Sequence, residues 1–133
     1  MTQIGEVLRS CRTIAVVGLS GRRSRPSYGV AEYLQKAGYR IVPVNPMESQ
    51  ILGEKCYPDL ESIPGEVDIV DIFRRSEFVP EIVEAAIRKG AKVIWMQEGV
   101  VHEEAARRAE AAGLTVIMDR CILKDHRRLA YAS

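Results

Sequence analysis

Three segments of the chain repeat one order, a helix end, then a glycine, then an apolar strand, and this repetition constrains the fold most. The segments are KAGYRIVPV (36–44), RKGAKVIWM (88–96) and EAAGLTVIM (110–118). A short continuous apolar run, such as TIAVVG (13–18), is typical of a strand buried on both faces of a parallel sheet. With VDIVDIF (67–73) as a further strand, the sequence predicts an α/β chain in which five strands alternate with helices.

The helices between these strands have recognisable ends. We expect one from Ser27, which can cap it, to Gly38, which suits the left-handed residue after a helix. A second ends at Gly90 and tolerates Pro80 only in its first turn. Further helices are expected over 102–113, in the lead-in segment 1–12 and in the C-terminal tail 122–133. Pro43 lacks an amide donor, so the strand over 39–45 should lie at a sheet edge or be ending there.

Composition narrows the functional classes. The 133 residues fit one domain, 1–133, with 47% hydrophobic and 28% charged residues and a net charge of +1. This charge argues against a general nucleic-acid or membrane-surface binder. No apolar run approaches the ~20 residues that span a bilayer, and MTQIGEVLRSCR lacks a signal-peptide core, so we expect a cytoplasmic protein. The cysteines and histidines have no metal-ligand spacing, so we expect no metal site.

The polar residues gather where the strands end. In a doubly wound sheet, ligands bind beyond the carboxyl ends of the strands, where the strand order reverses. The corresponding loops, which begin GLSGRRSRPSYG, VNPMESQILG, IFRRSE, MQEGV and MDRC, are richer in Arg, Gly, Ser, Asn and Gln than the opposite turns. This asymmetry predicts one polar, ligand-binding edge.

The first of these loops departs from a dinucleotide fingerprint. That motif reads G-x-G-x-x-G directly after the strand, whereas here the glycines are Gly18, Gly21 and Gly29. An NAD site also usually has an acidic residue at the end of the second strand, and this chain has Asn45 followed by Pro46. Both differences disfavour a plain NAD site.

The composition of this loop still favours a phosphate site. Glycines let the backbone approach an anion, and serine hydroxyls and helix N-terminal amides donate hydrogen bonds to it. Arginine pairs with phosphate in a forked geometry, and Arg22, Arg23 and Arg25 are joined by Arg74 and Arg75 at the end of the third strand. The alternative interpretation is that these arginines are solvated surface charges.

The same residues carry a family resemblance. GLS…RPSYGVAEYLQKAGYRIVPVNP, GEKCYPDLESIP, VDIVDIFRRSEFVPEIV and VIWMQEGVVHEEAARRAEAAGLTVIMDRC resemble the small stand-alone CoA-binding domain proteins. These are similar to the CoA-binding domain of the succinyl-CoA synthetase α subunit. The resemblance covers about residues 12 to 128 and implies a Rossmann-like, doubly wound, mostly parallel five-stranded sheet with helices on both faces.

The resemblance also implies a ligand, coenzyme A or an acyl-CoA, lying across the strand ends with its diphosphate near the first loop. The phosphate side would comprise Gly18, Ser20, Arg22, Arg25, Pro26, Ser27, Tyr28 and Gly29. The second strand end would contribute Val44, Asn45 and Pro46. Ile72, Phe73 and Arg74 would meet the adenosine or pantetheine part, and Met96, Gln97, Glu98 and Gly99 would close the far side.

CoA carries a diphosphate and a 3′-phosphate, which suits an arginine-rich edge. The same charges would admit NADP, which is the alternative ligand. The synthetases need a second domain that supplies a phosphorylated histidine, and nothing about the spacing of His102 gives it that role. The chain is thus expected to be a non-catalytic binding or regulatory module, with a homo-oligomer or another protein partner left open.

A catalytic alternative rests on Cys121, which follows Asp119 and Arg120 at the end of the fifth strand. An adjacent arginine can lower the pKa of a thiol, so Cys121 could serve a CoA-dependent redox or acyl-transfer enzyme. The other interpretation is a small residue that fills the strand end.

Asp71, inside the third strand, needs partners if it is buried, and Arg74 or Arg75 could supply them. Trp95 is expected in the core, whereas Tyr28 and Phe73 could stack on adenine or pack in the core.

Overall fold

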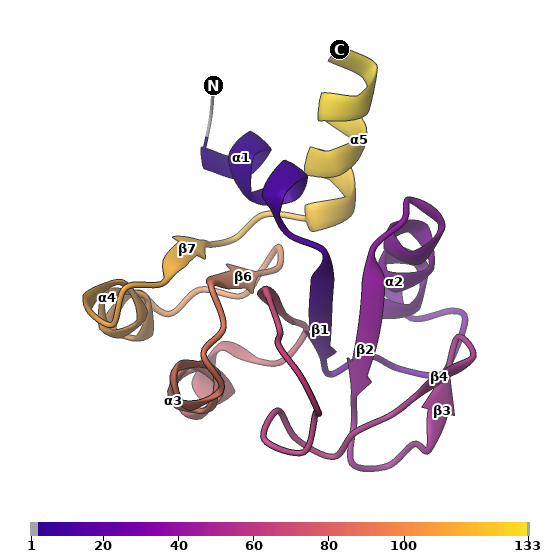
Figure 1. Cartoon of the computed structure of the whole chain (residues 1–133), viewed down its shortest axis with the longest axis horizontal. Helices are drawn as coiled ribbons and strands as arrows, with labels where there is room; N and C mark the ends of the chain where they lie inside the picture. The colour runs from indigo at the N-terminus through magenta and orange to yellow at the C-terminus, as the bar shows by residue number, and fades with distance from the viewer. Residues whose placement is uncertain (1–2, 133) are drawn as a thin grey trace.

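A computed structural model describes residues 3–132 of the chain, and Figure 1 shows how its helices surround the sheet. The elements in chain order are α1 (Gln3–Ser10), β1 (Thr13–Val17), α2 (Pro26–Lys36), β2 (Arg40–Val44), β3 (Gln50–Ile51), β4 (Glu54–Lys55), β5 (Ile69–Ile72), a 3₁₀ turn (Ser76–Phe78), α3 (Val79–Lys89), β6 (Val93–Met96), α4 (Glu103–Ala111), β7 (Thr115–Ile117) and α5 (Ile122–Ala132). None of the helices in the described range is long and apolar enough to cross a membrane.

Five strands form one sheet in the order β2-β1-β5-β6-β7. Every neighbouring pair in it is parallel. β2 is an edge strand of this sheet. Its Arg40 amide donates to the Arg12 carbonyl just before β1. Pro43 is three residues later, so its backbone nitrogen faces away from β1. The missing amide of Pro43 therefore interrupts no hydrogen bond between strands, as the sequence predicted. The second sheet, the hairpin β3–β4, was not predicted from the sequence.

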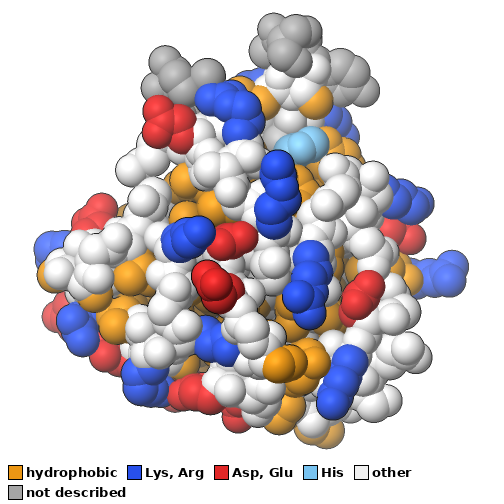
Figure 2. Space-filling view, in the orientation of Figure 1, with side chains coloured by type: hydrophobic (Ala, Val, Ile, Leu, Met, Phe, Trp, Pro, Cys, Tyr) orange, Lys and Arg blue, Asp and Glu red, His pale blue; other side chains and the backbone are white. Residues whose placement is uncertain are grey.

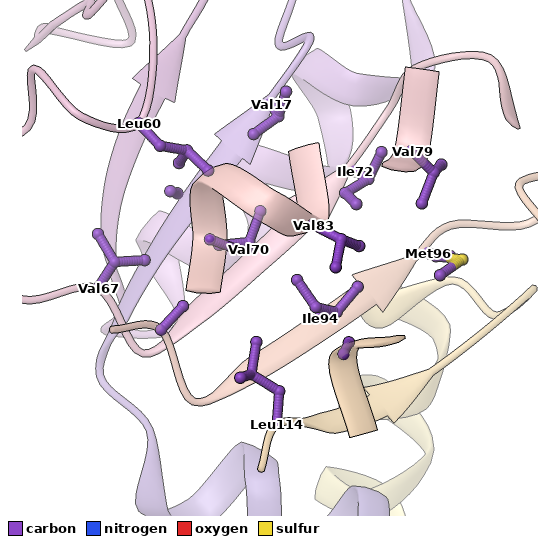
Figure 3. Close-up of a cluster of buried hydrophobic side chains, with 14 of the residues drawn as sticks. Val17, Leu60, Val67, Val70, Ile72, Val79, Val83, Ile94, Met96 and Leu114 are labelled. Atoms are coloured by element: carbon purple, nitrogen blue, oxygen red, sulfur yellow. The ribbon is translucent and has the colours of Figure 1, made fainter. Parts of the chain in front are cut away.

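Two hydrophobic clusters cover the two faces of the sheet. On one face, alternate strand residues such as Val70 and Ile94 pack against Val83 of α3 (Figure 3). Ala109 of α4 belongs to the same cluster. On the other face, the intervening strand residues pack against α1, α2 and α5, and Trp95 is fully buried there, as predicted. Helices on both faces of a parallel sheet confirm the predicted Rossmann-like, doubly wound α/β fold.

The helix boundaries agree with most of the sequence signals. Gly38 and Gly90 follow their helices with φ of +105° and +82°, the left-handed conformation predicted for them. Ser27 is an exception, because α2 begins at Pro26, with Arg25 before it and no side-chain cap. Proline suits the first helical position because its missing amide would have no partner there. The helix predicted over 102–113 begins at Glu103, and His102 is the residue before it. Nδ1 of His102 accepts a hydrogen bond from the Ala105 amide at 3.1 Å.

Candidate functional site

The strand order places the site. From β1 the chain crosses to β2 on one side and later returns to β5 on the other side of β1. The loops that follow β1 and β5 diverge over opposite faces of the sheet, which opens a crevice at their carboxyl ends. In Figure 1 the arrowheads of β1 and β2 point toward the β3–β4 hairpin and away from α1 and α5, so the crevice lies at that end.

Gly18 lies where these two loops touch. Its φ is +87°, and a Cβ atom built on it would lie 2.5 Å from the Phe73 carbonyl oxygen and 2.9 Å from Cδ of Arg74. No side chain fits so close to a backbone carbonyl, and non-glycine residues rarely adopt this φ. The glycine that ends the first strand therefore lets the first and third strand-end loops pack together.

Two cavities share Gly18 as a lining residue. The smaller, about 290 Å³, lies beside the start of α2 and is lined by Gly18, Ser20, Arg25, Pro26, Ser27 and Phe73. The larger, about 660 Å³, lies on the α3 side and is lined by Val17, Gly18, Val44, Asn45, Pro46, Met47, Pro58, Asp59, Leu60, Glu61, Arg74, Glu81, Ile82, Ala85 and Arg88. Ten of the residues that the sequence singled out thus line one cavity or the other.

Hydrogen bonds fix the shape of the first loop. The Ser20 amide donates to Oγ of Ser27 at 3.0 Å, and the Arg22 amide donates to Oγ of Ser20 at 3.1 Å. Ser27 is buried, so its hydroxyl anchors the loop to α2, and it does not cap that helix. The loop is thereby folded against the first turn of α2.

Asn45 joins the first loop to the second. Its Nδ2 donates to the Leu19 carbonyl at 2.9 Å, and its Oδ1 accepts from the Met47 amide at 2.8 Å. Both ends of the amide are therefore used within the protein. An aspartate here would lose the donation to Leu19, which gives a structural reason for an amide at this position.

The arginines at this edge have no acidic partners. Arg22, Arg23, Arg25, Arg74 and Arg75 are all exposed, and within residues 3–132 none of them forms an ion pair. Arg88 in the larger cavity, and Arg108, Arg120 and Arg128 elsewhere, each pair with a carboxylate. The described arginines outside the strand ends that also form no ion pair are Arg9, Arg12, Arg40, Arg107 and Arg127, so it is the clustering of five such arginines at the strand ends that distinguishes this edge. On the face in Figure 2, basic and acidic side chains are interspersed, which fits the near-zero net charge. The strand-end arginines are thus available to an anionic ligand.

The predicted residues after β6 line neither cavity. Gln97 is buried, and its Oε1 accepts from the Ile122 amide at 3.1 Å. Glu98 pairs with Lys124 at 3.0 Å, and the Gly99 amide donates to Asp119 at 2.8 Å. In the structure these groups attach the loop after β6 to α5 and to the loop after β7.

Five further predicted site residues also line neither cavity. They are Arg22, Tyr28, Gly29, Ile72 and Met96. Ile72 and Met96 are fully buried in the core. Arg22 is exposed and Gly29 lies within α2. Tyr28 and Phe73 are half-buried against the second hydrophobic cluster, and of these two only Phe73 also lines a cavity.

Asp71 differs from its predicted environment. It lies fully buried in β5 between Val16 and Trp95, and neither carboxylate oxygen has a hydrogen-bond partner. The expected pairing with Arg74 or Arg75 was wrong, because these side chains lie at the exposed strand end. Burial alone raises the pKa of Asp71 well above its usual range.

Cys121 is buried beside the end of β7. The neighbouring Arg120 makes a bidentate contact with Asp125, at 2.7 and 2.8 Å. Its charge is therefore already balanced by a carboxylate, and the arrangement gives no particular support to a reactive thiol.

Sequence reasoning missed the α3 wall of the larger cavity. Leu60, Ile82 and Ala85 contribute apolar surface there, and Met47, with 86% of its surface exposed, lies at the edge. The strand-end rule does not point to Leu60, Ile82 and Ala85, which come from α3 and from the loop after β4. Met47 does lie in the strand-end loop after β2, but it was not singled out there. The sequence signal for Ile82 is the apolar stripe of α3, which is also explained by core packing.

Comparisons with known proteins show the family of the chain. A family model described as "CoA binding domain" matches residues 12–127. The uncharacterized protein YneT of Bacillus subtilis (strain 168) is 46% identical over 124 residues, which cover 93% of this chain and 92% of that protein. The ADP-forming acetate–CoA ligase II of Archaeoglobus fulgidus is 34% identical over 101 residues, which cover 74% of this chain but 15% of the ligase.

Solved structures share the fold over almost the whole chain. A hypothetical protein from Pyrococcus horikoshii OT3 superposes with a TM-score of 0.94 at 40% identity, covering 98% of this chain and 93% of that one. A Thermus thermophilus protein, cell-free ID.343, superposes with a TM-score of 0.92 at 32% identity, covering 97% of this chain and 99% of that one.

Proposed function

Because the chain belongs to the CoA-binding domain family, we propose that it binds coenzyme A or an acyl-CoA at the carboxyl ends of its parallel strands. One observation carries this proposal, the two cavities that share Gly18 as a lining residue and have the exposed Arg25 and Arg74, without acidic partners, in their walls. CoA is long and carries several phosphates, so it matches an extended site with unpaired cations better than a small neutral ligand does.

The two cavities divide the proposed contacts. Gly18, Ser20, Arg25 and Ser27 around the smaller cavity form the phosphate side of the proposal, where the first turn of α2 also faces the ligand. Val44, Asn45, Pro46 and Arg74 line the larger cavity. For Gln97, Glu98 and Gly99, which serve internal contacts, we propose a supporting role through the loop after β6.

The proposed role is that of a non-catalytic binding or regulatory module in the cytoplasm. The chain spans only 15% of the A. fulgidus ligase and 27% of the ligase α subunit from Pyrococcus furiosus. The activity of those proteins is therefore not carried over to this chain. A protein partner or a second copy of the chain is compatible with a module that signals bound CoA.

Calorimetric titration of the purified protein tests the ligand. CoA should bind more tightly than dephospho-CoA, and NADP and NAD should bind much more weakly than CoA. The affinity for CoA should also fall with rising salt, because exposed arginines are screened. Binding of NADP without binding of CoA would overturn the proposal in favour of a dinucleotide site.

Single arginine substitutions test the location. Arg25→Ala and Arg74→Ala should each weaken CoA binding about tenfold, as loss of one charge-assisted contact does. The matched control is Arg107→Ala on α4, which removes an exposed arginine away from the strand ends and should leave the affinity unchanged. Equal affinities for all three variants would mean that CoA binds elsewhere.

A further inference from the structure

We propose that Phe78 is a positioning residue for ligand binding, because its ring holds the guanidinium of Arg74 at the larger cavity. This inference rests on the proposed function. Phe78 lines neither cavity and was not among the residues predicted from the sequence. It acts through Arg74, which does line the larger cavity.

Two contacts hold the distal part of the Arg74 side chain. Its guanidinium carbon lies 4.3 Å from the centroid of the Phe78 ring, a cation–π contact. Its Cδ lies against Gly18, so close that a Cβ atom on that glycine would come within 2.9 Å of it. The side chain is otherwise exposed, so these two contacts fix its direction.

Local structure brings Phe78 back over Arg74. The 3₁₀ turn Ser76–Phe78 closes with the Phe78 amide donating to the Arg75 carbonyl at 3.0 Å. α3 begins immediately afterwards, with Pro80 in its first turn, where proline favours the helical φ. The ring is therefore placed by a turn and a helix start, and it is half-buried, outside both core clusters.

The charges around the larger cavity give Arg74 a distinct role. Two cations line this cavity, and Arg88 is paired with Glu61 at 2.7 Å. Among the described lining residues, Arg74 is thus the cation without a carboxylate partner, while Asp59 and Glu81 also line the wall. A contact with an aromatic ring orients the guanidinium but does not neutralise its charge, so the charge stays available to an anionic group of the ligand.

The ring also lowers the entropic cost of binding. A free arginine side chain loses rotamer entropy when a ligand immobilises it. Contact with Phe78 already restricts the Arg74 side chain in the free protein, so less rotamer entropy is lost when the ligand binds. Loss of the ring should therefore weaken CoA binding by about 2- to 5-fold, the range expected for an exposed cation–π contact.

A double-mutant cycle on CoA affinity tests the coupling. Phe78→Leu should weaken binding about 2- to 5-fold, whereas Phe78→Tyr, which keeps the ring, should bind like the wild type. In the Arg74→Ala background, Phe78→Leu should have no further effect. In the Arg75→Ala background, which removes the adjacent exposed arginine, it should keep its full effect. A Phe78→Leu effect that persists unchanged without Arg74 would overturn the proposal.

A second measurement needs no ligand. In the NMR spectrum of the free protein, the Arg74 side-chain protons should show ring-current shifts that disappear in Phe78→Leu and persist in Phe78→Tyr. Absence of these shifts in the wild type would overturn the positioning role alone. If the shifts are present but the wild type binds no CoA, the proposed function fails, and the inference that depends on it fails as well.

Discussion

At the residue scale, Gly18 and Gly29 differ in whether the structure requires a glycine at their position. Gly18 has a left-handed φ, and it faces a backbone carbonyl so closely that a side chain cannot fit. Gly29 lies inside α2, where a Cβ atom would meet nothing within 4 Å. Both were predicted as site residues from the sequence, but only Gly18 has a packing reason to be a glycine.

Substitution by alanine should separate them. Gly18→Ala should destabilise the protein by about 2–4 kcal/mol, from strain in the backbone and overlap with the Phe73 carbonyl. Gly29→Ala should stabilise it by about 0.5–1 kcal/mol, because alanine is the better helix former. Urea unfolding of both variants measures these changes. Equal effects would contradict the close approach at Gly18.

Asp71 is predicted to make stability depend on pH. Burial raises its folded pKa above that of the unfolded chain, so between the two values the folded state binds more protons. The contribution of Asp71 to the free energy of unfolding is therefore most favourable below the unfolded pKa, and it falls as the pH rises toward the folded pKa. Asp71→Asn, which cannot ionise, should be more stable than the wild type at pH 8 by at least ~1 kcal/mol, or about 4 °C in Tm.

The comparison across pH isolates this carboxyl group. The stability advantage of Asp71→Asn should shrink toward pH 4, because the wild-type carboxyl is then increasingly protonated in both states. Glu66→Gln is the control, since Glu66 is exposed and its carboxylate forms no ion pair within residues 3–132. Parallel pH profiles for the wild type and Asp71→Asn, measured by thermal melts, would show that Asp71 is not held neutral.

At the element scale, the start of α4 depends on His102. Its Nδ1 accepts from the Ala105 amide and satisfies one of the helix's unpaired N-terminal donors. His102→Ala should therefore cost about 1 kcal/mol of stability, whereas His102→Asn should retain most of it, because asparagine is a good N-cap. Denaturant unfolding of the two variants checks this, and an equal loss in both would exclude capping as the cause.

The small hairpin shows where element prediction fails. Its turn residues Leu52 and Gly53 both have positive φ, at 54° and 77°. Turns of this kind normally carry Asn-Gly or Asp-Gly, and leucine at positive φ gives no such signal. The strands β3 and β4 also have two residues each, too few for a hydrophobic alternation.

The longer elements could be predicted because their patterns reflect the core. Each of the five strands of the parallel sheet was found from an apolar run, and Gly38 and Gly90 marked two helix ends. The capping role predicted for Ser27 was wrong and that of His102 was missed, because a cap signal depends on one side chain. Pro26 could start α2 without a cap, and histidine is an uncommon one.

At the scale of the whole molecule, the sequence could predict that the site lies at the carboxyl ends of the strands. It could not predict which other residues line the two cavities. The strand-end rule brought Gly18, Asn45 and Arg74 together from three separate loops. It could not predict that Ile72 and Met96 would be fully buried in the core. Nor could it predict the α3 wall or the contact between Arg74 and Phe78, which depend on how the third loop turns into its helix.

Binding of CoA across the strand ends, over both cavities, is tested most directly by titrating the ¹⁵N-labelled protein with CoA and following the amide chemical shifts. We expect the largest shifts at Gly18, Ser20, Asn45 and Arg74, which line the cavities, and small shifts along α4. No shifts at saturating CoA, or shifts confined to α4, would contradict a site at the strand ends.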